Sequence, residues 1–212
     1  MEVGLPLLLK KVKQQNVLAV WKIEEKESDL SRLLTFSKNM QLQLSAIICG
    51  EKRREWIASR ILLQDIMQCV ACVTYKPNGK PLLLSNAHDI SISHTKGFAA
   101  VLVTNNIPAG IDIEYTSRRI ARISCRFISK QERNHITENP DEQICSITWC
   151  AKEALYKMAD TPGLSFKNNM RIDPFHLKNK GSLTGKMKIG QIWRPIALNY
   201  IATSEFHLVW HW

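Results

Sequence analysis

The order of the expected elements most constrains the fold, because a strand, a long helix and a run of strands occur twice along the chain. In the first half, these are a strand at Val17 to Ile23, a short helix at Asp29 to Leu34, a long helix at Glu51 to Val70, and strands at Leu82 to Leu84, Ile90 to Ser93 and Ala99 to Thr104. The second half has a strand around Asp112, a helix at Ser129 to His135, a long helix at Asp141 to Ala159, and strands at Gly185 to Ile192, Ile196 to Thr203 and Glu205 to Trp212.

Asn105-Asn106-Ile107-Pro108 breaks the pattern and separates the halves, which we take as 1–105 and 106–212. The residues of the two halves do not obviously repeat. The sequence pattern alone therefore predicts an α+β protein with one domain or two small lobes. In the last strand, alternation places His207 and His211 on one face, where we expect an ordinary surface pair rather than a metal site.

The segment from Trp149 to Lys157 places functional groups about one helical turn apart. Trp149 can anchor the helix, while Glu153 and Lys157 lie on successive turns and Lys152 adds a second ammonium group. Taken alone, Glu153 and Lys157 also match a solvated (i, i+4) salt bridge, worth only about 0.3–0.5 kcal/mol. The rest of the chain favours a functional site.

Gly110-Ile111-Asp112-Ile113-Glu114 alternates so that both isoleucines point to one face of a strand and both carboxylates to the other. Two like charges on one face repel, so the strand either exposes them to water or places a cation between them. The donors are all oxygens, which suits magnesium better than zinc. An exposed strand face remains the alternative.

Two further motifs lie between residues 78 and 95. Asn78-Gly79-Lys80-Pro81 predicts a tight turn, with Lys80 projecting into solvent unless an anion is near. The segment from Ile90 to Thr95 predicts a strand with Ile90 and Ile92 inward, ending in Ser93 and His94, where a phosphate could bind. A serine hydrolase is disfavoured because no Gly-x-Ser-x-Gly elbow is present and adjacent strand residues face opposite ways. A structural role for His94 remains open.

In this order, the four motifs resemble those of the Sfp-like 4′-phosphopantetheinyl transferases: a Gly-Lys-Pro turn, a Ser-His-Ser corner, a Gly-x-Asp-x-Glu strand and a Trp-x-x-Lys-Glu-Ala-x-x-Lys helix. Thr95 replaces the usual serine and keeps the hydroxyl. The segment from Arg126 to Glu132 is similar to a fifth element of the family, and Arg60 to its N-terminal arginine. The resemblance covers about half of the chain.

The resemblance implies two similar lobes related by a pseudo-twofold axis, with the active site in the cleft between them. It implies magnesium-dependent transfer of 4′-phosphopantetheine from coenzyme A to a serine of an apo acyl or peptidyl carrier protein, with release of 3′,5′-ADP. The expected metal ligands are Asp112, Glu114 and Glu153. The expected coenzyme A contacts are Arg60, Lys80, Pro81, Ser93, His94, Lys152 and Lys157.

The catalytic residues implied are Glu153, Lys152 and Lys157. Lys157 would neutralise phosphate charge, and Lys152 would bind phosphate or assist proton transfer. Glu153, Lys152 or a metal-bound water remain alternatives for the base. Glu132 would orient the metal shell or a water. The pathway served, whether fatty-acid, polyketide or peptide synthesis, stays open.

The net charge of +10 indicates anionic partners. The basic clusters are short and separated, which disfavours nucleic acid, and no apolar run reaches the roughly 18–20 residues of a membrane span. Coenzyme A and an acidic carrier protein fit better. The six cysteines lack framework spacing and suggest free thiols, so we expect a cytoplasmic protein. A chain with both lobes need not assemble to complete a site, so we expect a monomer. An inactive relative that only binds these partners, and a basic nucleic-acid-binding module, are the alternatives.

Overall fold

The computed structural model describes residues 7–84, 88–136 and 142–212. Contacts divide the chain into two compact units, residues 1–107 and residues 108–212. Every strand pair found in the described residues is antiparallel. The protein is thus a mixed α+β structure with antiparallel sheets, as the sequence predicts.

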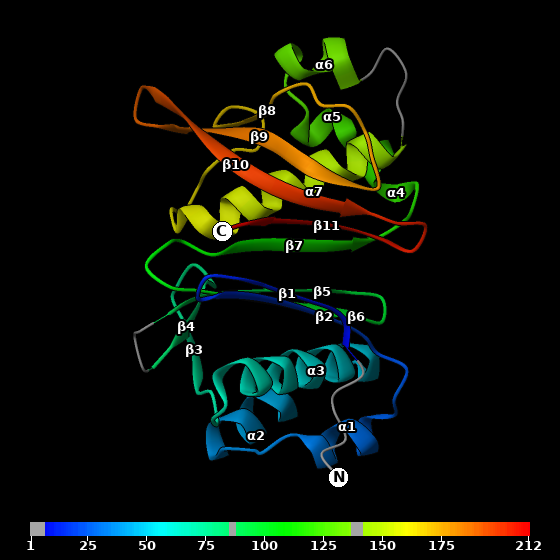
Figure 1. The fold of residues 1–212 in the computed structure, drawn as a ribbon, viewed down its shortest axis with the longest axis vertical. Coiled ribbons are helices and arrows are strands. Elements are labelled where there is room, and N and C mark those ends of the chain that lie inside the picture. The colour runs from blue at the N-terminus through cyan, green and yellow to red at the C-terminus, as the bar shows by residue number, and fades with distance from the viewer. Residues whose placement is uncertain (1–6, 85–87, 137–141) are drawn as a thin grey trace. The chain divides into compact units, whose positions relative to one another are not determined.

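The N-terminal unit is a four-stranded sheet with one face covered by a long helix (Figure 1). Its elements are β1 (Leu7–Lys13), β2 (Asn16–Lys22), α1 (Glu27–Leu33), α2 (Lys38–Ser45), α3 (Gly50–Met67), β3 (Val73–Tyr75), β4 (Pro81–Leu83), β5 (Asp89–Thr95) and β6 (Phe98–Thr104). The strand order is β1-β2-β6-β5, and β3 and β4 form a separate hairpin. The apolar stripe of α3 packs on the sheet through buried Ile57, Ile61 and Leu62.

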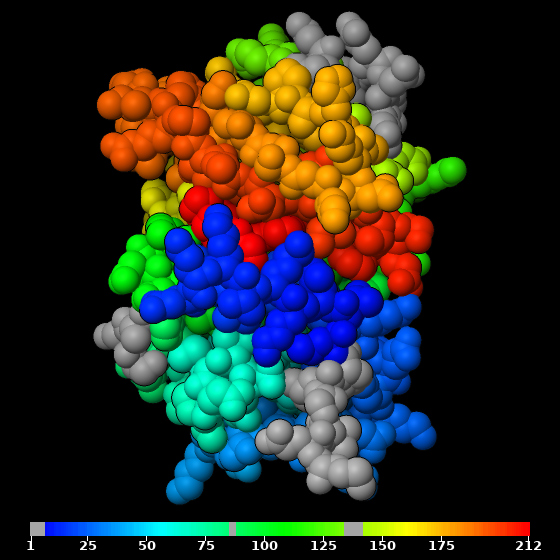
Figure 2. Space-filling model, in the orientation of Figure 1, coloured from blue at the N-terminus to red at the C-terminus, as the bar shows by residue number. Residues whose placement is uncertain are grey.

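Strand β1 is an edge of this sheet, and exposed side chains alternate with partly buried ones along it; the strand is part of the dark blue surface in Figure 2. Its sequence includes Lys10, Lys11 and Lys13. Lysines on an edge strand oppose pairing with another chain, because their charges repel an approaching strand.

The C-terminal unit repeats the arrangement of a sheet with a long helix on one face (Figure 1). Its elements are β7 (Gly110–Tyr115), α4 (Arg119–Arg122), α5 (Ser124–Phe127), α6 (Lys130–Ile136), α7 (Glu142–Ala159), β8 (Met170–Ile172), β9 (Lys180–Ile189), β10 (Ile192–Ala202) and β11 (Phe206–His211). The strand order is β7-β11-β10-β9-β8. Ala151, Ala154 and Leu155 of α7 pack on this sheet, and small alanines let the helix approach closely.

Several boundaries differ from the sequence predictions for local reasons. Helix α3 ends at Met67 rather than residue 70, because Gln68 adopts a left-handed conformation. The strand expected at 185–192 is β9, which starts at Lys180 and stops before a turn at Gly190. The predicted start of α7, Asp141, lies outside the described residues.

The predictions placed His207 wrongly, and they missed the elements β1, α2, β3, α4, α5 and β8. His207 is buried, because β11 is an interior strand and α7 covers the face on which this side chain lies. Its Nδ1 lies 2.8 Å from Ser146 Oγ of α7. In the described part of the chain, no helix is both long enough and apolar enough to cross a membrane.

Candidate active site

The site is built where strand β7 lies against helix α7, and a glycine sets the distance between them. A Cβ atom on Gly110 would lie 2.3 Å from the carbonyl oxygen of Ala154 and 3.0 Å from Cβ of Met158. The backbones of strand and helix therefore approach more closely than any side chain at position 110 permits. This explains why the acidic strand begins with glycine.

The two carboxylates of β7 face α7 rather than open water. Asp112 is buried, and its Oδ1 accepts a hydrogen bond from Lys157 Nζ at 2.7 Å. The same ammonium group donates to the carbonyl oxygen of Ile111. Glu114 Oε1 accepts from Trp149 Nε1 at 3.2 Å. The predicted shared face of Asp112 and Glu114 is therefore present, and two predicted residues of the helix contact it.

Trp149 anchors the helix within an aromatic cluster. Its ring lies 5.1 Å from the ring of Phe127 in an edge-to-face arrangement and 5.5 Å from the ring of Phe166. Such contacts fix ring orientation, so the indole N–H is held toward Glu114. The anchoring role predicted for Trp149 agrees with this packing.

Glu153 lies between these contacts along the helix, within the electrostatic reach of both strand carboxylates. Burial, followed by the charge of Asp112 and then that of Glu114, raises the pKa of Glu153 to about 7, although Lys157 acts in the opposite direction. An acid with this pKa exchanges its proton readily near neutral pH. The alternative of a solvated Glu153–Lys157 pair is disfavoured, since Lys157 donates to Asp112 instead.

The donor chemistry of Asp112, Glu114 and Glu153 fits a hard divalent cation. Burial, and after it repulsion from Asp112 and Glu114, raises the pKa of Glu153, and a cation would relieve the repulsive part. In the described part of the chain, however, no three His, Cys, Asp or Glu side chains are gathered as a ligand set. Asp112 contacts Lys157 and Glu114 contacts Trp149. An ion would therefore have to compete with those two donors.

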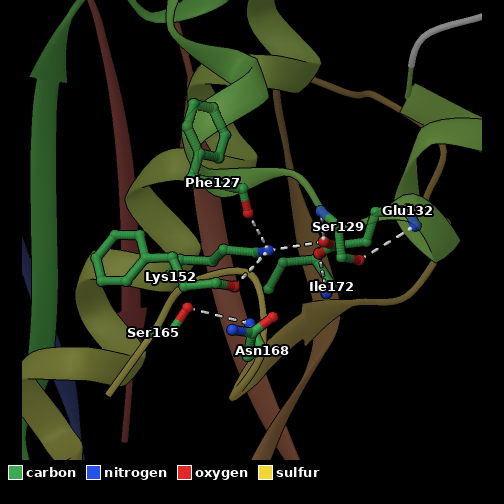
Figure 3. A network of polar contacts seen from close by, with 8 residues as sticks. Phe127, Ser129, Glu132, Lys152, Ser165, Asn168 and Ile172 are labelled. Carbon is green, nitrogen blue, oxygen red and sulfur yellow. Dashed lines mark hydrogen bonds and ion pairs between the residues drawn. The ribbon is translucent and has the colours of Figure 1, made fainter. Parts of the chain in front are cut away.

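Lys152 occupies a different environment from the one predicted, because its ammonium group is fully buried among protein acceptors (Figure 3). Nζ donates to the carbonyl oxygen of Phe127 at 2.7 Å, to Glu132 Oε2 at 2.7 Å and to the carbonyl oxygen of Phe166 at 2.9 Å. An ammonium group has three protons, so all are engaged. The expectation that Lys152 binds phosphate or moves a proton disagrees with this arrangement.

Glu132 is buried and belongs to the same network (Figure 3). Oε2 also accepts from the backbone N–H of Ser129, while Oε1 accepts from the N–H of Ile172 in β8. Ser129 Oγ in turn accepts from the N–H of Glu132, which completes the predicted helix cap. The role expected for Glu132 at a metal or water is replaced by a structural one.

In the N-terminal unit, the predicted turn at Asn78-Gly79 is present between β3 and β4. Gly79 has a φ of +84°, a conformation that glycine adopts without strain. Lys80 was expected to project into solvent unless an anion was near. Such an anion is present, because Asp89 Oδ2 lies 2.9 Å from Lys80 Nζ. Pro81 begins β4 and is half-buried.

Arg60 of α3 is buried against aromatic rings. Its guanidinium carbon lies 4.5 Å from the ring centre of Trp56, and Nη2 donates to the hydroxyl of Tyr75. Burial lowers the pKa of Arg60, although Tyr75 opposes the shift. With only 1% of its surface exposed, Arg60 is held inside the unit.

Ser93 and His94 are adjacent on β5 and point to opposite faces of the sheet, as the argument against a serine hydrolase requires. His94 pairs with Ala99 of β6 on the face covered by α3, and its Nδ1 lies 2.9 Å from Glu55 Oε2. Ser93 is buried on the other face.

Glu55 was missed by the sequence analysis. It is 1% exposed, and Lys52 Nζ donates to the same oxygen, Oε2, at 2.7 Å. Burial raises the pKa of Glu55, but the hydrogen bonds from His94 and Lys52 outweigh it, so the pKa lies below its ordinary value. The spacing of Lys52 and Glu55 was the available signal, but it is common on solvated helices.

One family model matches this chain: residues 108–203 match the model of the 4′-phosphopantetheinyl transferase superfamily. The match spans most of the C-terminal unit, including β7 and α7, and somewhat less than half of the chain. It confirms, over these residues, the resemblance seen in the sequence. No curated protein matches the chain.

Proposed function

We propose, on the premise that the C-terminal unit is that of a 4′-phosphopantetheinyl transferase superfamily protein, that this chain transfers the 4′-phosphopantetheine group of coenzyme A to a serine of an apo acyl or peptidyl carrier protein. The observation that carries the proposal is the facing arrangement of Asp112, Glu153 and Lys157, which lies inside the matched region. We place the reaction in the cytoplasm, where coenzyme A is available to a monomeric enzyme.

In the transfer, the serine Oγ forms a bond to the phosphorus that carries the pantetheine arm. The bond from that phosphorus to the bridging oxygen breaks, and 3′,5′-ADP leaves with the electron pair. The serine proton must pass to a base. Glu153 is the candidate acceptor in the metal-free site, where its pKa of about 7 permits proton uptake near neutral pH; a cation bound at Glu153 would lower that pKa.

Phosphoryl transfer relies mainly on alignment and on neutralisation of developing charge. Magnesium, held by Asp112, Glu114 and Glu153, would supply Lewis-acid polarisation of the pyrophosphate. Lys157 would turn from Asp112 toward the phosphates once Asp112 has another cationic partner. We assign Lys152 to the internal network that positions α7, because its protons are already taken.

The N-terminal unit would hold the nucleotide end of coenzyme A. Of the residues expected there, His94 is the most available, because 37% of its side chain is exposed. Lys80 would exchange Asp89 for a phosphate oxygen, and Pro81 would keep its turn in place. Ser93 and Arg60 are buried and would act from within the unit. We also propose that two similar lobes, related by a pseudo-twofold axis, enclose one site.

The test is the intact mass of apo carrier proteins of the fatty-acid, polyketide and peptide types after incubation with this protein and coenzyme A. We expect a gain of one phosphopantetheine group on at least one carrier, and only when magnesium is present. A separate binding measurement with coenzyme A identifies an inactive relative, which would bind without transfer. Absence of transfer to every carrier would refute the proposed function.

Two variants sharpen this test. Asp112→Ala should lower the transfer rate by at least about a hundredfold, because charge stabilisation by a metal site is worth several kcal/mol. Asp173→Asn is the matched control, since Asp173 is a partly exposed carboxylate of the same unit paired with Lys186 at 2.8 Å. Equal rates for Asp112→Ala and the wild type would remove the metal assignment.

A further inference from the structure

We propose that Glu55 is a positioning residue for His94, which it fixes so that Nε2 is presented to an anionic phosphate oxygen of coenzyme A. The inference rests on the proposed function and adds a residue outside the motifs by which the family resemblance was seen. It concerns the N-terminal unit, which lies outside the region matched by the family model.

The geometry that carries it joins a buried carboxylate to a partly exposed imidazole. Glu55 is 1% exposed, whereas 37% of the His94 side chain is exposed. Nδ1 of His94 lies 2.9 Å from Glu55 Oε2, so the ring edge that carries Nδ1 faces the helix. Nε2 occupies the opposite side of the ring and is the nitrogen that remains to meet a ligand.

Glu55 is suited to this task because it is held as an anion. Burial acts against its charge, but the donors from His94 and Lys52 outweigh burial. Both donors meet the same oxygen, and Oε1 is buried with no hydrogen-bond partner among the described residues. The two donors that meet Oε2, from Lys52 and His94, hold the carboxylate in one orientation.

The consequence for His94 is a defined proton arrangement. A carboxylate only accepts, so Nδ1 carries a proton. When Nε2 carries a proton as well, it can donate to a phosphate oxygen while Nδ1 stays bonded to Glu55. Without Glu55, the ring could rotate or take the other tautomer, and the Nε2 donor would no longer be held in one place.

The first experiment determines the tautomer of the His94 ring by nitrogen NMR. It uses alkaline buffer, in which histidine is neutral. We expect the Nδ1–H tautomer in the wild type and its loss in Glu55→Met, a substitution that keeps side-chain length and suits a buried site. Glu55→Gln keeps an acceptor and should retain the tautomer. Lys52→Met is the control, because it removes the other partner of Glu55 and leaves His94 bonded.

The second experiment measures binding of 3′,5′-ADP, the nucleotide product, by calorimetry. Glu55→Met and His94→Ala should each weaken binding by about tenfold, as expected for a coupled charged contact. The double variant should lose no more than His94→Ala alone, because Glu55 acts through His94. In turnover, Glu55→Met should raise the KM for coenzyme A and leave kcat nearly unchanged.

The outcomes separate this inference from the proposed function. Full 3′,5′-ADP affinity in Glu55→Met, with weakened binding in His94→Ala, overturns the positioning role and leaves the proposed function standing. An unchanged His94 tautomer in a folded Glu55→Met protein overturns it as well. Absence of 3′,5′-ADP binding to the wild type overturns both.

Discussion

Glu153 shows how a single residue of this site responds to its surroundings, because burial and two neighbouring carboxylates disfavour its charge. With its pKa raised to about 7, Glu153 keeps its proton in the folded protein over a range in which the unfolded chain has lost it. Between pH of about 4.5 and about 7 the folded state therefore binds more protons. The contribution of Glu153 to the free energy of unfolding must fall as pH rises through this window.

We accordingly predict that Glu153→Gln removes a downward slope of stability with pH. The measurement is urea unfolding of the metal-free wild type and variant at several pH values across that window, with a chelator present. The difference between the two proteins should grow in favour of the variant as pH rises. Parallel stability curves would show that Glu153 titrates normally.

At the same scale, the sequence predicts which residues share a face but not which partner each one finds. Alternation in β7 correctly places Asp112 and Glu114 together, since strand geometry is local. The contact of Lys157 with Asp112 spans 45 positions, and that of Lys152 with Glu132 spans 20. Such pairings depend on how the elements pack, which single-residue patterns do not encode.

At the scale of elements, the ammonium group of Lys152 joins three helices and a strand through backbone and side-chain acceptors. It meets Phe127 of α5, Glu132 of α6 and the carbonyl of Phe166, and Glu132 continues to β8 through Ile172. Burial lowers the pKa of Lys152, while Glu132 counteracts this shift. The network therefore orients the helix that carries Glu153.

We predict that Lys152→Met destabilises the protein by about 3–5 kcal/mol, because it leaves the Glu132 carboxylate buried without its cation. The midpoint of urea unfolding, followed by tryptophan fluorescence, measures the loss. The double variant Lys152→Met with Glu132→Gln should recover part of it. Lys186→Met is the control and should cost less, because its partner Asp173 is partly exposed. Equal effects of the two lysine substitutions would contradict a structural role for Lys152.

Element prediction succeeded where local signals were strong and failed where they were weak. The stripe of α3 and the cap formed by Ser129 and Glu132 were both readable, because helix periodicity and capping are local. Strand β1 is rich in lysine and α2 is only 8 residues long, so pairing and packing with distant segments decide both.

For the whole molecule, the net charge of +10 governs encounter with anionic partners. We predict that the association rate with an acidic apo carrier protein falls by about tenfold or more between low and high salt, because salt screens long-range steering. Stopped-flow association at increasing sodium chloride measures this. Sucrose at matched osmolality is the control and should leave the rate nearly unchanged. A rate independent of salt would exclude electrostatic steering.

The predicted fold class depended least on individual residues. The order of strands and long helices was enough to predict an α+β structure, because each sheet needs a helix to cover its apolar face. The strand orders β1-β2-β6-β5 and β7-β11-β10-β9-β8 could not be predicted, since hairpin and crossover pairings satisfy the same alternation.

The close approach at Gly110 limits how far strand β7 can move from helix α7 without disturbing the site. A single methyl group there would meet the backbone of α7 at 2.3 Å and would push the acidic strand away from the helix. A displacement of about 1 Å can cost an aligned reaction about a hundredfold in rate. Position 110 thus sets the distance between the acidic strand and the helix. This distance stays short only because glycine has no Cβ atom.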